Sequence, residues 1–249
     1  MESNRRSDAM PATSLPRESW LRKGVLAGLL ATFAMTIALL AAYALARGIG
    51  AESGNLLQRW CWALVHNPIT ERTADRLVLA VGANLAVGLV LALVYARVVE
   101  PMLSGPGWRR GVMFSIVPWL LSIIVFLPAA GGGLLGIDIG AGPLPVIGNL
   151  LLHLVYGAVL GTVYAQPAYD WLDDTAADHE NSAAAERGAA IGTAIGLPVG
   201  FVVGWLIAPM FPGLVGQAEA AIGLAFVGAA IGLSVGSFAA MGDRSQPAR

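Results

Sequence analysis

The sequence predicts an all-α membrane protein, a polytopic bundle of six transmembrane helices. Of its 249 residues, 56% are hydrophobic and only 12% are charged, and the mean hydropathy is +0.68. Soluble domains carry about 25% charged residues, so this chain must bury its apolar surface in a bilayer. Uncharged runs long enough to cross about 30 Å of hydrocarbon recur six times. The alternating pattern of a membrane barrel is absent, which leaves helices as the only spanning structure.

The first run, residues 24–46, has 23 uncharged residues, whereas a signal peptide has an apolar core of roughly 7–15. We therefore expect an uncleaved first span, although Ala44-Leu45-Ala46 resembles a signal-peptidase site. The six expected spans are residues 24–46, 77–98, 110–130, 143–166, 188–210 and 217–241.

The positive charges indicate the orientation of these spans. An even number of spans places both termini on one side, and that side carries eleven of the 15 Lys and Arg residues. Because positive residues favour the cytoplasmic side, we expect both termini to be cytoplasmic. The eleven are Arg5, Arg6, Arg17, Arg22, Lys23, Arg97, Arg109, Arg110, Arg187, Arg244 and Arg249, and the opposite side holds Arg47, Arg59, Arg72 and Arg76.

Two segments outside the spans have a character of their own. Residues 55–67 predict a short amphipathic helix rich in Trp, which either lies flat in the outer headgroup layer or covers the bundle as a lid. Residues 170–187 are acidic around His179, but their spacing matches no EF-hand, so we expect a solvated linker and no metal site. The expected organisation is a tail (1–23), a four-helix module (24–169), the linker (170–187), a two-helix hairpin (188–242) and a tail (243–249).

Small residues recur at every fourth position in most spans, a spacing that lets two helix backbones approach closely in lipid. The last two spans are predicted to clasp one another as a glycine zipper, with Pro198 producing either a structural bend or a hinge. The helix-packing residues are Gly188, Gly192, Gly196, Gly200 and Gly204 in the fifth span, Gly228, Gly232 and Gly236 in the sixth, and Gly157 and Gly161 in the fourth.

Three polar residues share these stripes and form the candidate buried polar cluster: His153, Asn149 and Asn84. Because small residues mark the side of a helix that faces other helices, we expect all three inside the bundle. An ionisable group near mid-membrane is a functional candidate, which singles out His153. The structural alternative, which we favour, is a neutral histidine that contributes about 1 kcal/mol of helix association.

Two spans carry patterns of small, hydroxyl and aromatic residues: Gly24, Gly28, Thr32, Met35 and Thr36 in the first span, and His153, Tyr156, Gly157, Gly161 and Tyr164 in the fourth. On these residues the first four spans resemble uncharacterised prokaryotic multi-pass membrane families, YagU-like proteins of unknown function among them. The resemblance covers residues 24–168 and implies the cytoplasmic (inner) membrane of a prokaryote, with no activity to carry across.

Three functions remain open at this point. The first, which we prefer, is a non-catalytic accessory or structural subunit that associates through small-residue faces with a larger membrane complex or with copies of itself. The second is a small-solute transporter or channel with a polar path near His153, although the spans lack acidic and basic residues away from their ends. The third is a haem- or quinone-associated protein using His66 and His153, whose expected depths differ. We predict no catalytic residue and no cofactor. We also expect no nucleic-acid partner, because the net charge of −1 offers no basic surface. The bilayer itself is the expected partner.

Overall fold

A computed structural model describes residues 20–51, 54–166, 178–210 and 216–239, and no strand occurs among them. Six helical segments in this part of the chain are long and apolar enough to cross a membrane. The predicted all-α polytopic fold is therefore confirmed. The six segments are Trp20–Gly50, Leu77–Met102, Gly107–Ala129, Leu144–Tyr164, Ala184–Met210 and Gln217–Ala239.

Individual helices divide some of these segments. The α-helices are α1 (Trp20–Gly50), α2 (Leu56–Val65), α3 (Pro68–Asp75), α4 (Leu77–Val94), α5 (Gly107–Leu121), α6 (Leu127–Ala129), α7 (Leu144–Tyr164), α8 (Asp178–Ile207) and α9 (Gln217–Ala239). The π-helical turns are η1 (Tyr95–Val99) and η3 (Ser122–Phe126), and the 3₁₀ turns are η2 (Glu100–Met102), η4 (Leu134–Ile139) and η6 (Ala208–Met210).

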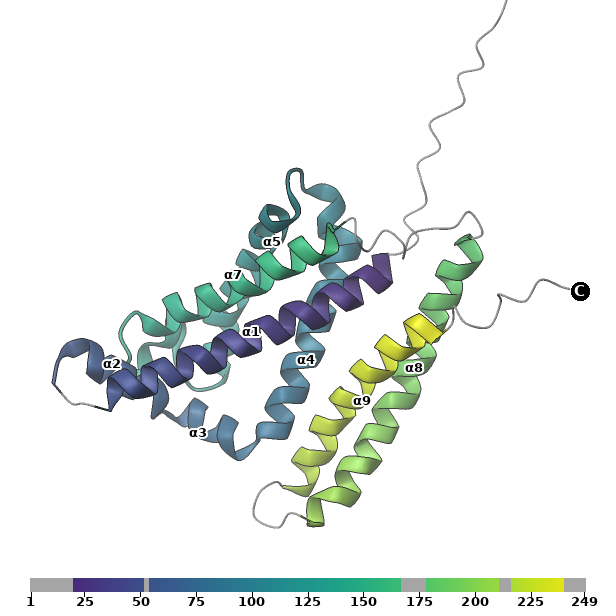
Figure 1. Ribbon diagram of the computed structural model, residues 1–249. Helices are drawn as coiled ribbons and strands as arrows, with labels where there is room; N and C mark the ends of the chain where they lie inside the picture. The colour runs from purple at the N-terminus through teal and green to yellow at the C-terminus, as the bar shows by residue number, and fades with distance from the viewer. Residues whose placement is uncertain (1–19, 52–53, 167–177, 211–215, 240–249) are drawn as a thin grey trace, which may run out of the picture.

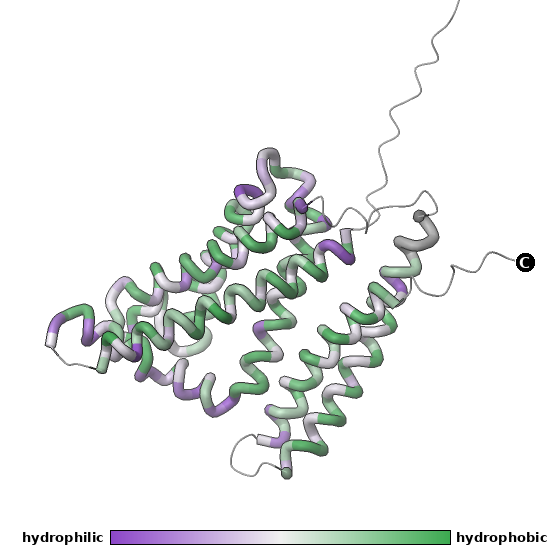
Figure 2. Tube along the Cα trace, in the orientation of Figure 1, coloured by the Kyte–Doolittle hydropathy of each residue, from purple (hydrophilic) through white to green (hydrophobic). Residues whose placement is uncertain are grey.

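Helix α1 joins the parts of the four-helix module. It packs against α4 and α7, and α7 in turn packs against α5. The hairpin of α8 and α9 stands beside this module, with α9 lying between α8 and α4 (Figure 1). Apolar residues run along all the long helices, whereas hydrophilic residues gather at α2, α3 and the α4–α5 connection (Figure 2). The two ends of the bundle are therefore polar and its middle is apolar, as a bilayer requires.

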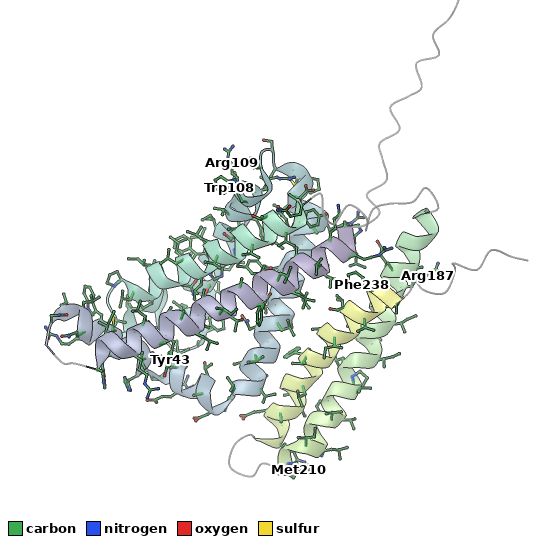
Figure 3. The ribbon with its side chains drawn as sticks, viewed as in Figure 1. Tyr43, Trp108, Arg109, Arg187, Met210 and Phe238 are labelled. Carbon is green, nitrogen blue, oxygen red and sulfur yellow. The ribbon has the colours of Figure 1, made fainter. Side chains whose placement is uncertain are left out.

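The hairpin is held by backbone-to-backbone contact. A side-chain carbon added to Gly192 would collide with the carbonyl group of Gly232, and one added to Gly196 would collide with that of Gly228. No side chain separates the two helices at these points, so van der Waals contact between backbones supplies their association. The same contact recurs at Gly200 against Leu224, at Gly204 against Ala220 and at Gly236 against Gly188. Arg187 and Phe238 mark one end of the hairpin and Met210 the other (Figure 3).

Helices α5 and α7 use the same kind of contact. Gly111 on α5 lies against the backbone of Gly157, and Gly107 lies against that of Gly161. These α7 glycines are two members of the predicted fourth-span stripe, so that stripe faces α5. This contact also fixes the position of the polar residues on the same stripe of α7, Asn149 and His153.

The contact between α1 and α4 ends halfway across the membrane. In the half of the bundle that is predicted to face the cytoplasm, which we term the inner half, Gly24 and Gly28 of α1 lie against Ala96 and Ala92 of α4, and Thr32 fills the space over Gly88. Beyond Thr36 the small-residue stripe of α1 gives way to larger side chains, Leu39, Leu40 and Tyr43, all of which are exposed. Because bulky side chains prevent close approach, the two helices diverge there, and α2 and α3 bridge their outer ends (Figure 1).

Two prolines account for the π-helical turns. A proline inside a helix cannot donate to the carbonyl four residues earlier, and its ring clashes with that carbonyl. Pro101 stands four residues after Arg97 in η1, and Pro128 stands four residues after Ile124 in η3. In both cases the helix widens to a π turn around the affected carbonyl. By contrast, α8 continues through Pro198.

The hairpin docks along α4, from Gly82 to Leu89. Gly82 of α4 and Gly223 of α9 lie backbone to backbone, and Leu89 and Ala230 form a small buried cluster with Val25 of α1. At the outer end, Arg76 forms an ion pair with Glu219 at 2.9 Å. Glu219, in the first turn of α9, therefore connects this helix to the start of α4.

Several predicted boundaries shift or fall outside the described residues. Helix α8 begins at Asp178, ten residues before the predicted start at Gly188, because the strong helix formers Ala183, Ala184, Ala185 and Glu186 extend it beyond the apolar span. Residues 1–19 of the predicted first tail, residues 170–177 of the predicted linker, residues 240–242 of the predicted hairpin and the predicted last tail, 243–249, lie outside the described part of the chain.

A pair of identical substitutions measures how much the backbone contacts stabilise the fold. Gly232→Ala places a methyl group against the Gly192 carbonyl, so we expect the free energy of unfolding to fall by about 1–3 kcal/mol despite the higher helix propensity of alanine. Gly148→Ala on α7 is the control, because no atom lies within 4 Å of its added carbon. Denaturant titration of both variants in detergent micelles tests this, and equal stability would contradict the close-packing account.

Candidate functional site

The interface between α5 and α7 carries polar side chains at membrane depth. Trp119 donates its indole N–H to the backbone oxygen of Val146 at 3.3 Å, and Asn149 donates from Nδ2 to Oγ of Ser122 at 3.0 Å. Ser122 is the first residue of the π turn that precedes Pro128. The glycine contacts farther along the two helices bring these groups within reach of each other.

His153 lies one turn from Asn149 on the same stripe. Its side chain is 9% exposed, and its Nδ1 lies 2.9 Å from the backbone oxygen of Asn149. Since a carbonyl oxygen only accepts, Nδ1 carries the proton in this contact. Oδ1 of Asn149 is buried without a hydrogen-bond partner. The structure thus places His153 and Asn149 together, with one unpaired acceptor beside them.

Asn84, the third member of the predicted cluster, lies elsewhere. It belongs to α4, where it is exposed and donates from Nδ2 to Oγ1 of Thr36 at 3.2 Å. The hydroxyl of Thr36 donates in turn to the backbone oxygen of Thr32 at 2.8 Å. The expectation that Asn84 lies inside the bundle is wrong, because α1 and α4 diverge at this point and leave the amide uncovered. The four-residue spacing correctly predicted that Asn84 lies on the face of α4 that points toward α1. It did not predict the point at which α1 and α4 separate.

Tyr156 makes a polar contact that the four-residue spacing of small residues does not predict. Its hydroxyl donates to the backbone oxygen of Gly88 at 2.6 Å, and its side chain is buried. The phenol of α7 therefore contacts the α4 backbone directly. This bond connects α7 to α4, and no local sequence pattern indicates it.

A second group of partly polar residues closes the end of the bundle that is predicted to be cytoplasmic. Arg110 at the start of α5 donates to the carboxylate of Glu100, which joins the ends of α4 and α5. The buried ring of Tyr95 packs edge-on against Tyr164, with ring centroids 5.7 Å apart, and lies tilted against Phe114, with centroids 5.3 Å apart. This end is therefore held by one ion pair and a cluster of packed aromatic rings.

The two histidines considered as haem ligands occupy different environments. His66 follows α2, where its Nδ1 lies 3.0 Å from the backbone oxygen of Trp62 and its ring stacks on the Trp62 indole. His153 lies on the α7 stripe that faces α5. Among the described residues, no group of three or more His, Cys, Asp or Glu side chains could hold a metal ion. Cys61 is buried and free.

Residues 19–170 match a family of unknown function, DUF6789. This match covers more than half of the chain. The chain belongs to the DUF6789 family. The matched residues include α1 to α7, so the hairpin of α8 and α9 lies outside the DUF6789 region. No curated protein and no solved structure matches the chain. The resemblance to YagU-like proteins is not tested by the DUF6789 match and stays a prediction.

The polar pair in the DUF6789 region gives a test of structural hydrogen bonding. Ser122→Ala removes the acceptor of Asn149 and leaves its amide unpaired in the bundle, so we expect a loss of about 0.5–1.5 kcal/mol of stability. Adding Asn149→Leu removes the unpaired amide, together with Oδ1, and should restore most of that loss. Unfolding titrations of the single and double variants measure both effects. A double variant no more stable than Ser122→Ala would contradict this account.

Proposed function

We propose that this membrane protein is a non-catalytic accessory or structural subunit, and that it binds a transmembrane helix of a partner protein through the outer half of α1. The proposal assigns no catalytic residue and no cofactor. We also propose that it resides in the cytoplasmic membrane of a prokaryote with both termini in the cytoplasm, which the distribution of Lys and Arg supports.

The glycine stripes that suggested association are occupied by the chain itself. The hairpin glycines lie against each other's backbones, and those of α7 lie against α5. A helix from another protein cannot approach these backbones without displacing a helix of this chain. A partner must therefore use small residues that have no neighbour within the chain.

The outer half of α1 offers such residues, and this observation carries the proposal. Seven consecutive residues, Leu39–Leu45, are exposed, and they include Ala41, Ala42 and Ala44. One turn farther, Gly48 has no atom within 4 Å of an added side-chain carbon. Ala41, Ala44 and Gly48 follow helical spacing and form one face, which we term the small-residue face. Its backbone is open to the close approach that the other stripes have already used.

Photo-crosslinking tests this contact. We expect a photoreactive p-benzoylphenylalanine at position 45, beside the small-residue face, to form a protein adduct of one discrete mass in native membranes. The same residue at position 195 is the control, because Ile195 is exposed on α8, away from α1. Gel shift and mass spectrometry of both adducts provide the measurement.

A substitution pair supports the crosslink. Ala44→Phe should reduce recovery of the partner from mild detergent, whereas Ala190→Phe, at an exposed alanine on α8, should not. An adduct with the mass of a second copy of this chain would show that the partner is the protein itself, and the proposed function would then be a homo-oligomer and not an accessory subunit. Lipid adducts alone at position 45, with no protein product, would refute association through this face.

Transport is the second candidate, favoured by the buried unpaired Oδ1 of Asn149 beside His153. An unpaired acceptor at membrane depth is a feature of a polar path as well as of packing. If His153 serves a path, His153→Ala should abolish solute or proton flux into proteoliposomes, while Asn84→Ala, on α4, should leave it unchanged. Equal flux in wild type and His153→Ala would remove His153 from any transport role.

A further inference from the structure

A cavity of about 220 Å³ lies where the outer end of α1 meets α2. Gly50 forms this junction, because its α-carbon approaches the backbone of Trp62 so closely that a side chain would not fit. Ala46 packs there with Cys61 and Val65 of α2. Reciprocal hydrogen bonds between Asn55 and Gln58 cap the start of α2 and fix its direction. The walls of the cavity are therefore held by packed helices.

The lining of the cavity combines one cation, two rings and small apolar residues. Arg47, Trp62 and His66 line it together with Ala46, Gly50, Ala51 and Val65, and none of the described carboxylates does. Arg47 is exposed, and no ion pair in the described part of the chain involves it. The Trp62 and His66 rings stack with centroids 4.6 Å apart and form one wall. Nδ1 of His66 donates to the Trp62 backbone oxygen, so Nε2 of the neutral ring can only accept, and Arg47 is the cation that this lining offers to an anion.

The position of the cavity matches the headgroup layer of a bilayer. It lies at the end of the first membrane segment, beside an amphipathic helix whose Leu56, Leu57 and Trp62 are exposed. Such a helix places its apolar side chains at the boundary between headgroups and acyl chains. The most abundant anion at that depth is the phosphate of a phospholipid.

An exposed apolar strip on α1, formed by Leu39 and Tyr43, leads from the cavity into the membrane, and we term it the apolar lane. Helical spacing puts Leu39 and Tyr43 on the same face of α1 as Ala46 and Gly50. Leu39 is 50% exposed and Tyr43 is 40% exposed. Tyr43 is labelled in Figure 3, in the part of α1 that has separated from α4. The lane ends where Asn84 hydrogen-bonds Thr36 and the two helices come together.

The length of this lane fits one leaflet. Eleven residues separate Thr36 from Arg47, which is about 16 Å of helix. Half of the hydrocarbon thickness is about 15 Å. An acyl chain whose headgroup sits at Arg47 would therefore reach the point where α1 and α4 meet.

We propose that this site binds one phospholipid, with its phosphate in the cavity against Arg47 and an acyl chain along Leu39 and Tyr43. A guanidinium can donate two parallel hydrogen bonds to a phosphate, which makes Arg47 the main determinant of headgroup binding. The lane lies on the face of α1 opposite Ala41 and Gly48, so lipid and partner helix occupy separate surfaces.

Native mass spectrometry of the delipidated full-length protein tests the headgroup. We expect phosphatidylglycerol and phosphatidylethanolamine each to bind one molecule, and Arg47→Gln to weaken both about tenfold, the equivalent of about 1.4 kcal/mol. Arg59→Gln is the matched control, because Arg59 is an exposed arginine of α2 that does not line the cavity. Equal affinity in the two variants would overturn the site. Displacement of the lipid by millimolar inorganic phosphate would identify free phosphate as the ligand and overturn the lipid assignment.

A second readout tests the lane independently of the charge. p-Benzoylphenylalanine at position 43 should form an adduct with the mass of a phospholipid, whereas position 45, two residues away, should give the partner protein. A polypeptide adduct at position 43 would refute the lane even if the headgroup result held. Failure of the position 45 crosslink alone would affect only the proposed subunit role.

Discussion

Contact between bare helix backbones is the constraint on which this structure depends. Water drives apolar side chains together in soluble proteins, but lipid provides no such force between helices. The chain brings Gly192 against Gly232 and Gly111 against Gly157, where the absence of a side chain permits van der Waals contact along the helices. The large apolar side chains, such as Ile195 on α8, are left on the outer surface, where acyl chains cover them. At these contacts the small residues lie inside and the large apolar residues lie outside.

The same constraint explains where the bundle opens. Close packing persists only while both helices offer small residues in register, and on α1 the last of them facing α4 is Thr36, opposite Asn84. Leu39 and Tyr43 then occupy the positions that would have to be small, so α4 diverges and is supported instead by α9 at Gly82 and Gly223. The hairpin therefore supports α4 where α1 does not. This makes the terminal hairpin, which lies outside the DUF6789 region, a structural support for the module that belongs to the family.

Much of this arrangement could be predicted from the sequence, because span length and four-residue spacing are direct consequences of helix geometry. Spacing predicts which face of a helix is small, and for His153 that face does lie in the bundle. It does not predict how far the neighbouring helix follows, which is why Asn84 was placed inside when it is exposed. The π turns around Arg97 and Ile124 could have been predicted from Pro101 and Pro128, which stand four residues later. The Tyr156 bond to Gly88 joins residues 68 positions apart, a pairing that no local pattern contains.

The outer half of α1 shows why a small-residue face and a large-residue face on one helix suit different neighbours. A rigid helix gains contact only where the opposing surface is flat, as it is at Ala41, Ala44 and Gly48. A flexible acyl chain can instead follow the uneven surface left by Leu39 and Tyr43. In the proposed lipid site Arg47, a charged group at the end of the second face, would hold the headgroup, because the apolar lane alone cannot distinguish one acyl chain from another. With both proposed neighbours in place, the exposed part of α1 would be packed on both faces by molecules of the membrane and not by the chain itself.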